Sequence, residues 1–172
     1  MGKGLKPDYY LSSLFTISAQ ELMEKGIKGL LLDIDNTLVP NHAPDADGRV
    51  LSFISRMHEA GIRLAILSNA STRRINLFNR PLGLPVVAGA FKPFRRCYRN
   101  GISLLDLSAP EVCMAGDQLF TDILGANRAG IRSLLVAPMH VSEPWYVRAK
   151  RLVEKSFIGD RTPSEKLGDE PP

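Results

Sequence analysis

Cysteine is scarce in this sequence, and its two cysteines, Cys97 and Cys113, have the spacing of neither a zinc site nor a disulfide framework. We therefore expect two ordinary thiols in a reducing cytoplasm. Apolar runs are also short, since none approaches the roughly eighteen residues of a membrane-spanning helix. The first residues lack the apolar stretch that marks a secretory signal. These absences predict a cytoplasmic protein without a membrane span.

Repeats, low-complexity segments and a strong charge bias are absent as well. The 172 residues, 44% of them hydrophobic and 23% charged, suffice for one domain with a full core. We expect this domain over residues 1–158, followed by a disordered tail over 159–172. The net charge of +4 is compatible with an anionic membrane, nucleic acid or a phosphorylated substrate, and equally with no particular partner.

Strand-like and helix-like segments alternate along the chain. Strands are predicted over residues 30–32, 62–67, 85–88, 112–116 and 131–137, and helices over 18–25, 45–60, 71–79, 94–107 and 119–129. A short helical turn opened by Pro7 is expected before them. Such alternation with short connections is typical of an α/β fold with a doubly wound, Rossmann-like parallel sheet.

Two aspartates follow the most apolar of these strands. Leu30-Leu31-Leu32 runs without alternation into Asp33, and Asp35 comes two residues later. Two carboxylates so close raise each other's pKa unless a positive charge lies beside them, and a hard cation such as Mg²⁺ would supply it. The alternative is an ordinary turn shaped by Asn36. The choice depends on the residues at the other strand ends.

Polar residues recur at the ends of three further predicted segments: Ser68 and Asn69, Lys92, and Asp117 with Asp122. In a doubly wound sheet the carboxyl ends of the strands converge on one crevice. We therefore expect these side chains and the two aspartates to lie together.

The order and chemistry of these residues resemble the four motifs of the haloacid dehalogenase-like (HAD) phosphohydrolases. The motifs stand here as Asp33-Ile34-Asp35-Asn36-Thr37, Leu67-Ser68-Asn69, Lys92-Pro93, and Gly116-Asp117 followed by Asp122. The resemblance implies that Asp33 is a nucleophile that forms an aspartyl-phosphate, and that Asp35 is the general acid and base. An acid at this second position favours a phosphatase or phosphomutase.

The same resemblance assigns the supporting residues. Ser68 and the backbone N–H groups around Asn69 would bind phosphoryl oxygens, and Lys92 would offset negative charge. Mg²⁺ would be held by Asp33, Asp117 and the backbone carbonyl of Asp35. Asp122 would support the metal through water or orient Lys92.

The short intervals between the motifs predict that no cap domain covers the site. One helix fits between Asp35 and Ser68, and one more fits between Ser68 and Lys92. An open site could admit a phosphate carried on a protein, a nucleic-acid end or a lipid headgroup. A neighbouring subunit could also serve as a lid, in which case small substrates stay possible.

Further stretches are similar to the YqeG-like, subfamily IIIA phosphatases, whose relatives include phosphatidylglycerophosphate phosphatases. These stretches are 5–10, 25–29, 80–85 and 116–128. The similarity implies hydrolysis of phosphatidylglycerophosphate to phosphatidylglycerol, with peripheral contact to the inner face of the membrane. The oligomeric state is left open.

Two terminal segments are compatible with a lipid surface. A predicted basic amphipathic helix carries Trp145 and Leu152 on one face beside Arg148, Lys150, Arg151 and Lys155, although such a helix could equally pack on the sheet. The aromatic N-terminal segment is a second candidate. Four arginines that follow the motifs, Arg73, Arg74, Arg95 and Arg96, are candidates for a second substrate phosphate.

Three hypotheses follow from these patterns. The first is a lipid phosphatase, and the second is a phosphatase of soluble or macromolecular phosphomonoesters. The third is a non-catalytic binding protein, for example for RNA. The intact motifs argue against the third hypothesis, because a protein that only binds has no need of Asp35 and Lys92 together. We expect no specific nucleic-acid partner.

Overall fold

The computed structural model of this protein describes residues 3–41, 43–87, 89–139 and 162–167. Its centre is a five-stranded sheet with the strand order β1-β5-β4-β2-β3, in which every pairing is parallel. The strands are β1 (Tyr9–Leu11), β2 (Gly29–Leu32), β3 (Arg63–Ile66), β4 (Val112–Gly116) and β5 (Arg132–Val136). This architecture confirms the predicted α/β class.

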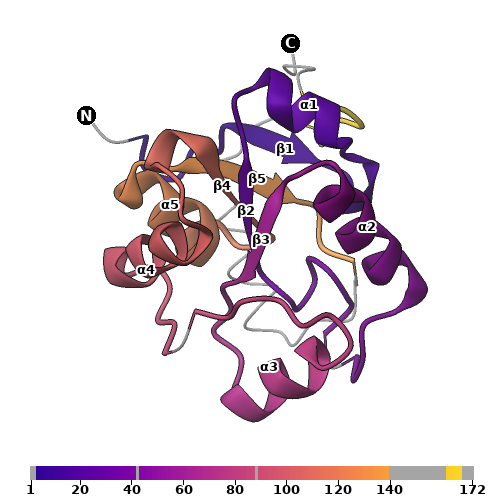
Figure 1. Ribbon diagram of the computed structural model, residues 1–172. Coiled ribbons are helices and arrows are strands. Elements are labelled where there is room, and N and C mark those ends of the chain that lie inside the picture. Colours follow the sequence, from indigo (N-terminus) through magenta and orange to yellow (C-terminus); the bar gives the residue numbers. More distant parts are fainter. Residues whose placement is uncertain (1–2, 42, 88, 140–161, 168–172) are drawn as a thin grey trace.

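Helices cover both faces of the sheet (Figure 1). They are α1 (Ala19–Glu24), α2 (Gly48–Glu59), α3 (Thr72–Asn79), α4 (Arg95–Leu105) and α5 (Leu124–Ala129). Helix α1 begins with the predicted capping box, in which Ser18 and Glu21 satisfy each other's backbone N–H groups. Since α2 and α3 are the only helices between the motif segments, the predicted absence of a cap domain is confirmed for the described chain.

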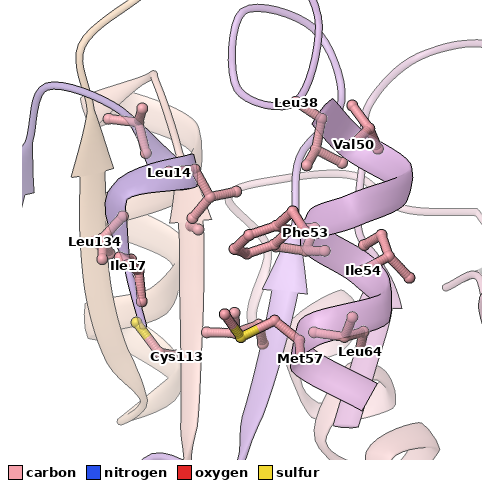
Figure 2. Close-up of a cluster of buried hydrophobic side chains, with 14 of the residues drawn as sticks. Leu14, Ile17, Leu38, Val50, Phe53, Ile54, Met57, Leu64, Cys113 and Leu134 are labelled. Carbon is pink, nitrogen blue, oxygen red and sulfur yellow. The ribbon is translucent and has the colours of Figure 1, made fainter. Parts of the chain in front are cut away.

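The core has two layers because successive side chains of β2 point to opposite faces of the sheet. Leu30 and Leu32 join the layer beneath α1 and α2, whereas Leu31 joins the layer beneath α4 and α5. Figure 2 shows the first layer, where the predicted apolar stripe of α2 points toward Leu14, Ile17 and Leu134. That stripe consists of Val50, Phe53, Ile54 and Met57, all buried.

The order of the strands reverses beside β2. The chain passes from β2 to β3 on one side and then crosses to β4 on the other, so the winding direction reverses between β2 and β4. Ligands of open α/β sheets bind at such a reversal, outside the carboxyl ends of the strands. Asp33 and Asp117 directly follow the two strands that border it.

Two predicted elements differ from the structure. The segment after Pro7 was expected to be helical, but Tyr9–Leu11 forms edge strand β1, held to β5 by contacts that include Asp8 with Ser133. Residues 85–88 were expected to form a strand, but only one bridge, Ile66↔Val86, is present among the described residues. Five strands were predicted and five are present, but the predicted strand over 85–88 is missing and β1 is present instead.

The predicted disordered tail also differs over the part that the structure describes. Ser164 exchanges backbone hydrogen bonds with β1 and its flank, at 2.9 Å to Tyr10 and 3.0 Å to Ser12. Leu167 is buried in the core. The predicted basic helix around Trp145 lies outside the described residues. Within the described chain, no helix combines the length and apolarity needed to cross a bilayer.

Candidate active site

The carboxyl edge of the sheet brings most of the predicted site residues together. Asp33 follows β2, Ser68 follows β3, and Asp117 follows β4. Lys92 lies in the segment between α3 and α4, which crosses below the sheet in Figure 1, on the same side as α3. Asp122 lies in a π-helical turn, Leu119–Ile123, which leads into α5.

Lys92 is the centre of a buried ionic cluster. Its Nζ lies 2.8 Å from Oδ1 of Asp33 and 2.6 Å from Oδ1 of Asp122. The side chain of Lys92 is 2% exposed, and those of Asp33 and Asp122 are 7% and 0% exposed. The other oxygen of Asp122 accepts a hydrogen bond from the backbone N–H of Gln118 at 3.0 Å. Asp122 thus makes the contact that orienting Lys92 requires.

Burial and charge act in opposite directions on this cluster. Burial by itself lowers the pKa of Lys92, but the Asp122 and Asp33 carboxylates outweigh it and raise that pKa, so the ammonium stays charged. Burial raises the pKa of Asp122 to about 6, opposed by Lys92 and assisted by Asp33. One fixed positive charge therefore sits among several carboxylates.

The carboxylates also form a candidate metal site. Asp33, Asp117 and Asp122, all buried, each offer an oxygen within 4.8 Å of the others. Three carboxylates against one ammonium leave negative charge that a cation would balance, and an all-oxygen set suits a hard divalent ion. Lys92 and the Gln118 N–H already contact the two oxygens of Asp122, so Asp33 and Asp117 stay the predicted ligands. The backbone carbonyl of Asp35 stays a predicted third ligand.

A compact turn after β2 positions Asp35. The backbone N–H groups of Leu38 and Val39 both donate to the Ile34 carbonyl, and Asn36 takes a left-handed conformation at φ 60°. Asn tolerates this conformation better than most residues, which explains its place here. The turn sends the Asp35 carboxylate toward α3, where Arg74 Nη2 donates to it at 3.1 Å.

Arg74 was predicted as a candidate for a second phosphate, and the structure places it on Asp35 instead. Its Nη1 also donates to the Pro44 carbonyl at 3.2 Å, and its guanidinium lies over the Phe78 ring. The positions of the charged residues in the sequence could not reveal this pairing, because Asp35 lies in the loop after β2 and Arg74 lies in the helix after β3. Arg73, its neighbour, is exposed.

Asn69 connects two of the motif segments. Its side chain accepts from the Lys92 N–H at 2.8 Å and donates to the Lys92 carbonyl at 3.1 Å. This paired contact fixes the backbone from which the Lys92 side chain enters the cluster. Ser68 is buried beside it, with its hydroxyl accepting from the Ala70 N–H at 3.3 Å. The phosphate-binding roles of Ser68 and Asn69 remain predictions.

Gly116, between β4 and Asp117, is required by the close approach of Asp122. A Cβ at this position would lie 2.2 Å from Asp122 Cγ, which is far inside van der Waals contact. Among the residues without a predicted site role, His58 is exposed, and His42 lies outside the described residues.

The chain is similar in sequence to known phosphatases. A family model described as HAD-hydrolase-like matches residues 90–138. The chain is 36% identical over 152 residues to a probable phosphatase, YqeG, of Bacillus subtilis, covering 88% of each chain. It is 30% identical to a chloroplastic phosphatidylglycerophosphate phosphatase 1 of Chlamydomonas reinhardtii, covering 88% of this chain and 59% of that protein.

Solved structures share the fold. The cobalt-bound deoxy-D-mannose-octulosonate 8-phosphate phosphatase YrbI of Haemophilus influenzae matches with a TM-score of 0.56 at 19% identity, over 81% of this chain and 90% of that one. CbbY of Rhodobacter sphaeroides in complex with phosphate matches with a TM-score of 0.53 at 17% identity, over 69% and 90%. From the identity to the Bacillus subtilis protein over nearly the whole length, together with the family match and the shared fold, the chain belongs to the haloacid dehalogenase-like hydrolases, among their phosphatases.

Proposed function

We propose that this phosphatase hydrolyses a phosphomonoester through Asp33 as the nucleophile. The observation that carries the proposal is the buried contact of 2.8 Å between Lys92 Nζ and Asp33 Oδ1, beside the reversal of strand order where ligands of such sheets bind. A charged ammonium there would offset the negative charge that gathers when a carboxylate approaches a phosphate. Asp33 also keeps a second oxygen for attack or for a metal ion.

The reaction would proceed in two steps. In the first, an Asp33 oxygen bonds to phosphorus, the bond to the leaving oxygen breaks, and Asp35 gives its proton to the departing alkoxide. In the second, Asp35 takes a proton from water as the water oxygen attacks phosphorus, which releases inorganic phosphate and regenerates the Asp33 carboxylate. Ser68 would hydrogen-bond a phosphoryl oxygen during both steps.

Magnesium is the cofactor that we propose for the acidic cluster. Asp33, Asp117 and the Asp35 backbone carbonyl would hold it, and Asp122 would keep Lys92 in place beside it. When bound, such an ion neutralises charge on the phosphoryl oxygens and orients them for in-line displacement.

The substrate that we propose is phosphatidylglycerophosphate. Two plant-type relatives are named for it: the Chlamydomonas protein, and one of Arabidopsis thaliana that is 25% identical over 88% of this chain. This chain spans 59% and 47% of those proteins, respectively. The lack of a cap over the described site supports a substrate whose phosphate is carried on a large or membrane-bound molecule.

Phosphate release from phosphatidylglycerophosphate in mixed micelles tests this proposal, with and without Mg²⁺. We expect the wild-type protein to release phosphate, a chelator to stop it, and Asp33→Asn to abolish it. Asp106→Asn is the matched control, since Asp106 lies on the surface with a left-handed backbone that Asn also accepts. Faster turnover of sugar or nucleotide phosphates would replace the lipid with a soluble substrate, and silence of both proteins on every substrate would favour a binding protein.

A further inference from the structure

Two phenylalanines beside the proposed site are exposed to solvent. Phe91 and Phe94 are each 70% exposed, more than any other large hydrophobic residue in the described chain. They flank Lys92, whose side chain is buried against Asp33. The same short segment therefore places a catalytic candidate inside the protein and two aromatic rings outside it. Exposure of two large apolar side chains so near a site is typical of a docking surface.

The surroundings of these rings are positively charged. Arg95, Arg96 and Arg99, in the first turns of α4, are all exposed, and the sequence contains no acidic residue from Phe91 to Leu105. Arg128 of α5 lines a hollow together with Pro93, Phe94 and Arg95. Since no carboxylate in this segment neutralises the arginines, the surface is complementary to an anionic partner.

We propose that this aromatic–arginine surface, made of Phe91, Phe94, Arg95, Arg96, Arg99 and Arg128, docks on an anionic phospholipid bilayer. The inference rests on the proposed lipid substrate and adds the surface that reaches it. The two rings would insert at the level of the headgroups while the guanidinium groups pair with lipid phosphates. Lys92 lies between the rings in the sequence and contacts Asp33, so docking there would bring headgroups close to the proposed nucleophile.

Vesicle flotation of the full chain tests this surface without depending on hydrolysis. We would use the wild-type protein with vesicles of phosphatidylglycerol mixed with phosphatidylcholine and with vesicles of phosphatidylcholine alone, since neither lipid carries the phosphomonoester that the proposed reaction consumes. We expect binding to the anionic vesicles that weakens with salt. Replacing both rings, Phe91→Ser with Phe94→Ser, should lower the bound fraction about tenfold, given the apolar area removed.

The matched control is Leu104→Ser, which removes another half-exposed apolar side chain from the far end of α4. It should bind like the parent, and unchanged melting temperatures would show that all variants are folded. Equal binding by the double phenylalanine variant, or no binding by the parent, overturns the proposal. Tight binding of an RNA oligonucleotide in place of vesicles would also overturn it and assign the surface to nucleic acid.

The lipid substrate and the docking surface fail in different ways. If phosphatidylglycerophosphate is not the substrate, the wild-type protein fails to release phosphate from mixed micelles while flotation still depends on Phe91 and Phe94. If only the docking surface is wrong, micellar hydrolysis persists and the double variant floats like its parent.

Discussion

Arg74 donates a hydrogen bond to Asp35 across 3.1 Å, although 39 positions separate the two residues in the sequence. The guanidinium also donates to the Pro44 carbonyl and lies over the ring of Phe78, so several contacts hold it in place. A carboxylate held in this way has fewer orientations than a free one. We therefore regard Arg74 as a positioning residue for the proposed general acid.

Arg74→Gln should slow reactions that need a proton on the leaving oxygen more than reactions that do not. We expect kcat for an alkyl phosphate to fall about 10–100-fold, because a misplaced general acid forfeits part of its contribution. With p-nitrophenyl phosphate, whose leaving group departs without a proton, the loss should be within about threefold. The measurement is kcat for the two substrates with the same protein preparation.

Arg73→Gln provides the comparison, because Arg73 is exposed on the same helix turn. It should leave both rates near those of the wild type. A rise in KM with equal kcat for both substrates would instead mean that Arg74 binds substrate, as the arginine spacing first suggested. In Asp35→Asn the alkyl rate should already be low, and adding Arg74→Gln should lower it little further.

Lys92→Met should impair both activity and stability. Loss of the ammonium leaves Asp33 and Asp122 as buried carboxylates without their shared partner, and breaking a buried ion pair on one side costs about 3–5 kcal/mol. Activity should fall about 100–1000-fold, as for other groups that stabilise transition-state charge. Denaturant unfolding and initial rates measure the two effects.

Lys28→Met is a suitable control for this loss of a lysine. Lys28 also pairs with a carboxylate, Glu111, at 2.7 Å, but its side chain is 62% exposed, so water can replace the contact. Its unfolding midpoint should stay close to that of the wild type. If both lysine variants unfold alike, the buried cluster does not contribute the stability that we assign to it.

Asn69→Ala should reduce activity by loosening the Lys92 backbone. The substitution removes both hydrogen bonds that tie Asn69 to Lys92, each worth about 0.5–1.5 kcal/mol. Asn76→Ala, at an exposed position of α3, is the control. The informative measurement is kcat together with the unfolding free energy, since a change in stability without a change in rate would leave Asn69 a purely structural role.

The convergence of Asp33 and Asp117 could be predicted from the sequence because it follows from topology, whereas Lys92 and Asp122, which follow no strand directly, were expected there from their place in the four motifs. Parallel strands end at one edge, so residues placed just after them meet whatever the loops do in detail. The contact between Arg74 and Asp35 could not be predicted, since it depends on how the turn after β2 folds and on the rotamer of a long side chain. Local sequence patterns specify neither the conformation of this turn nor the rotamer of Arg74.

The mistaken elements have a similar origin. Tyr9–Leu11 became a strand because β5 offered an unpaired edge and Ser133 a partner for Asp8, although Pro7 favours the start of a helix by itself. Ser164 in turn pairs beside β1, which explains why part of a tail with polar composition is ordered. Tertiary pairing overrode local propensity in both segments.

Gly116→Ala should disrupt the site while the rest of the fold persists. The added Cβ would lie 2.2 Å from Asp122 Cγ, so Asp122 must move away from Lys92 or the strand must shift. We expect a loss of about 1–3 kcal/mol in stability from overpacking. A displacement of about 1 Å in such a site lowers kcat by about 100-fold.

Gly48→Ala is the control, because nothing lies within 4 Å of its Cβ position and Gly48 is the first residue of α2. That control should retain full activity with equal or greater stability, and a Gly116→Ala protein as active as the control would mean that the Asp122–Lys92 contact is not needed for turnover.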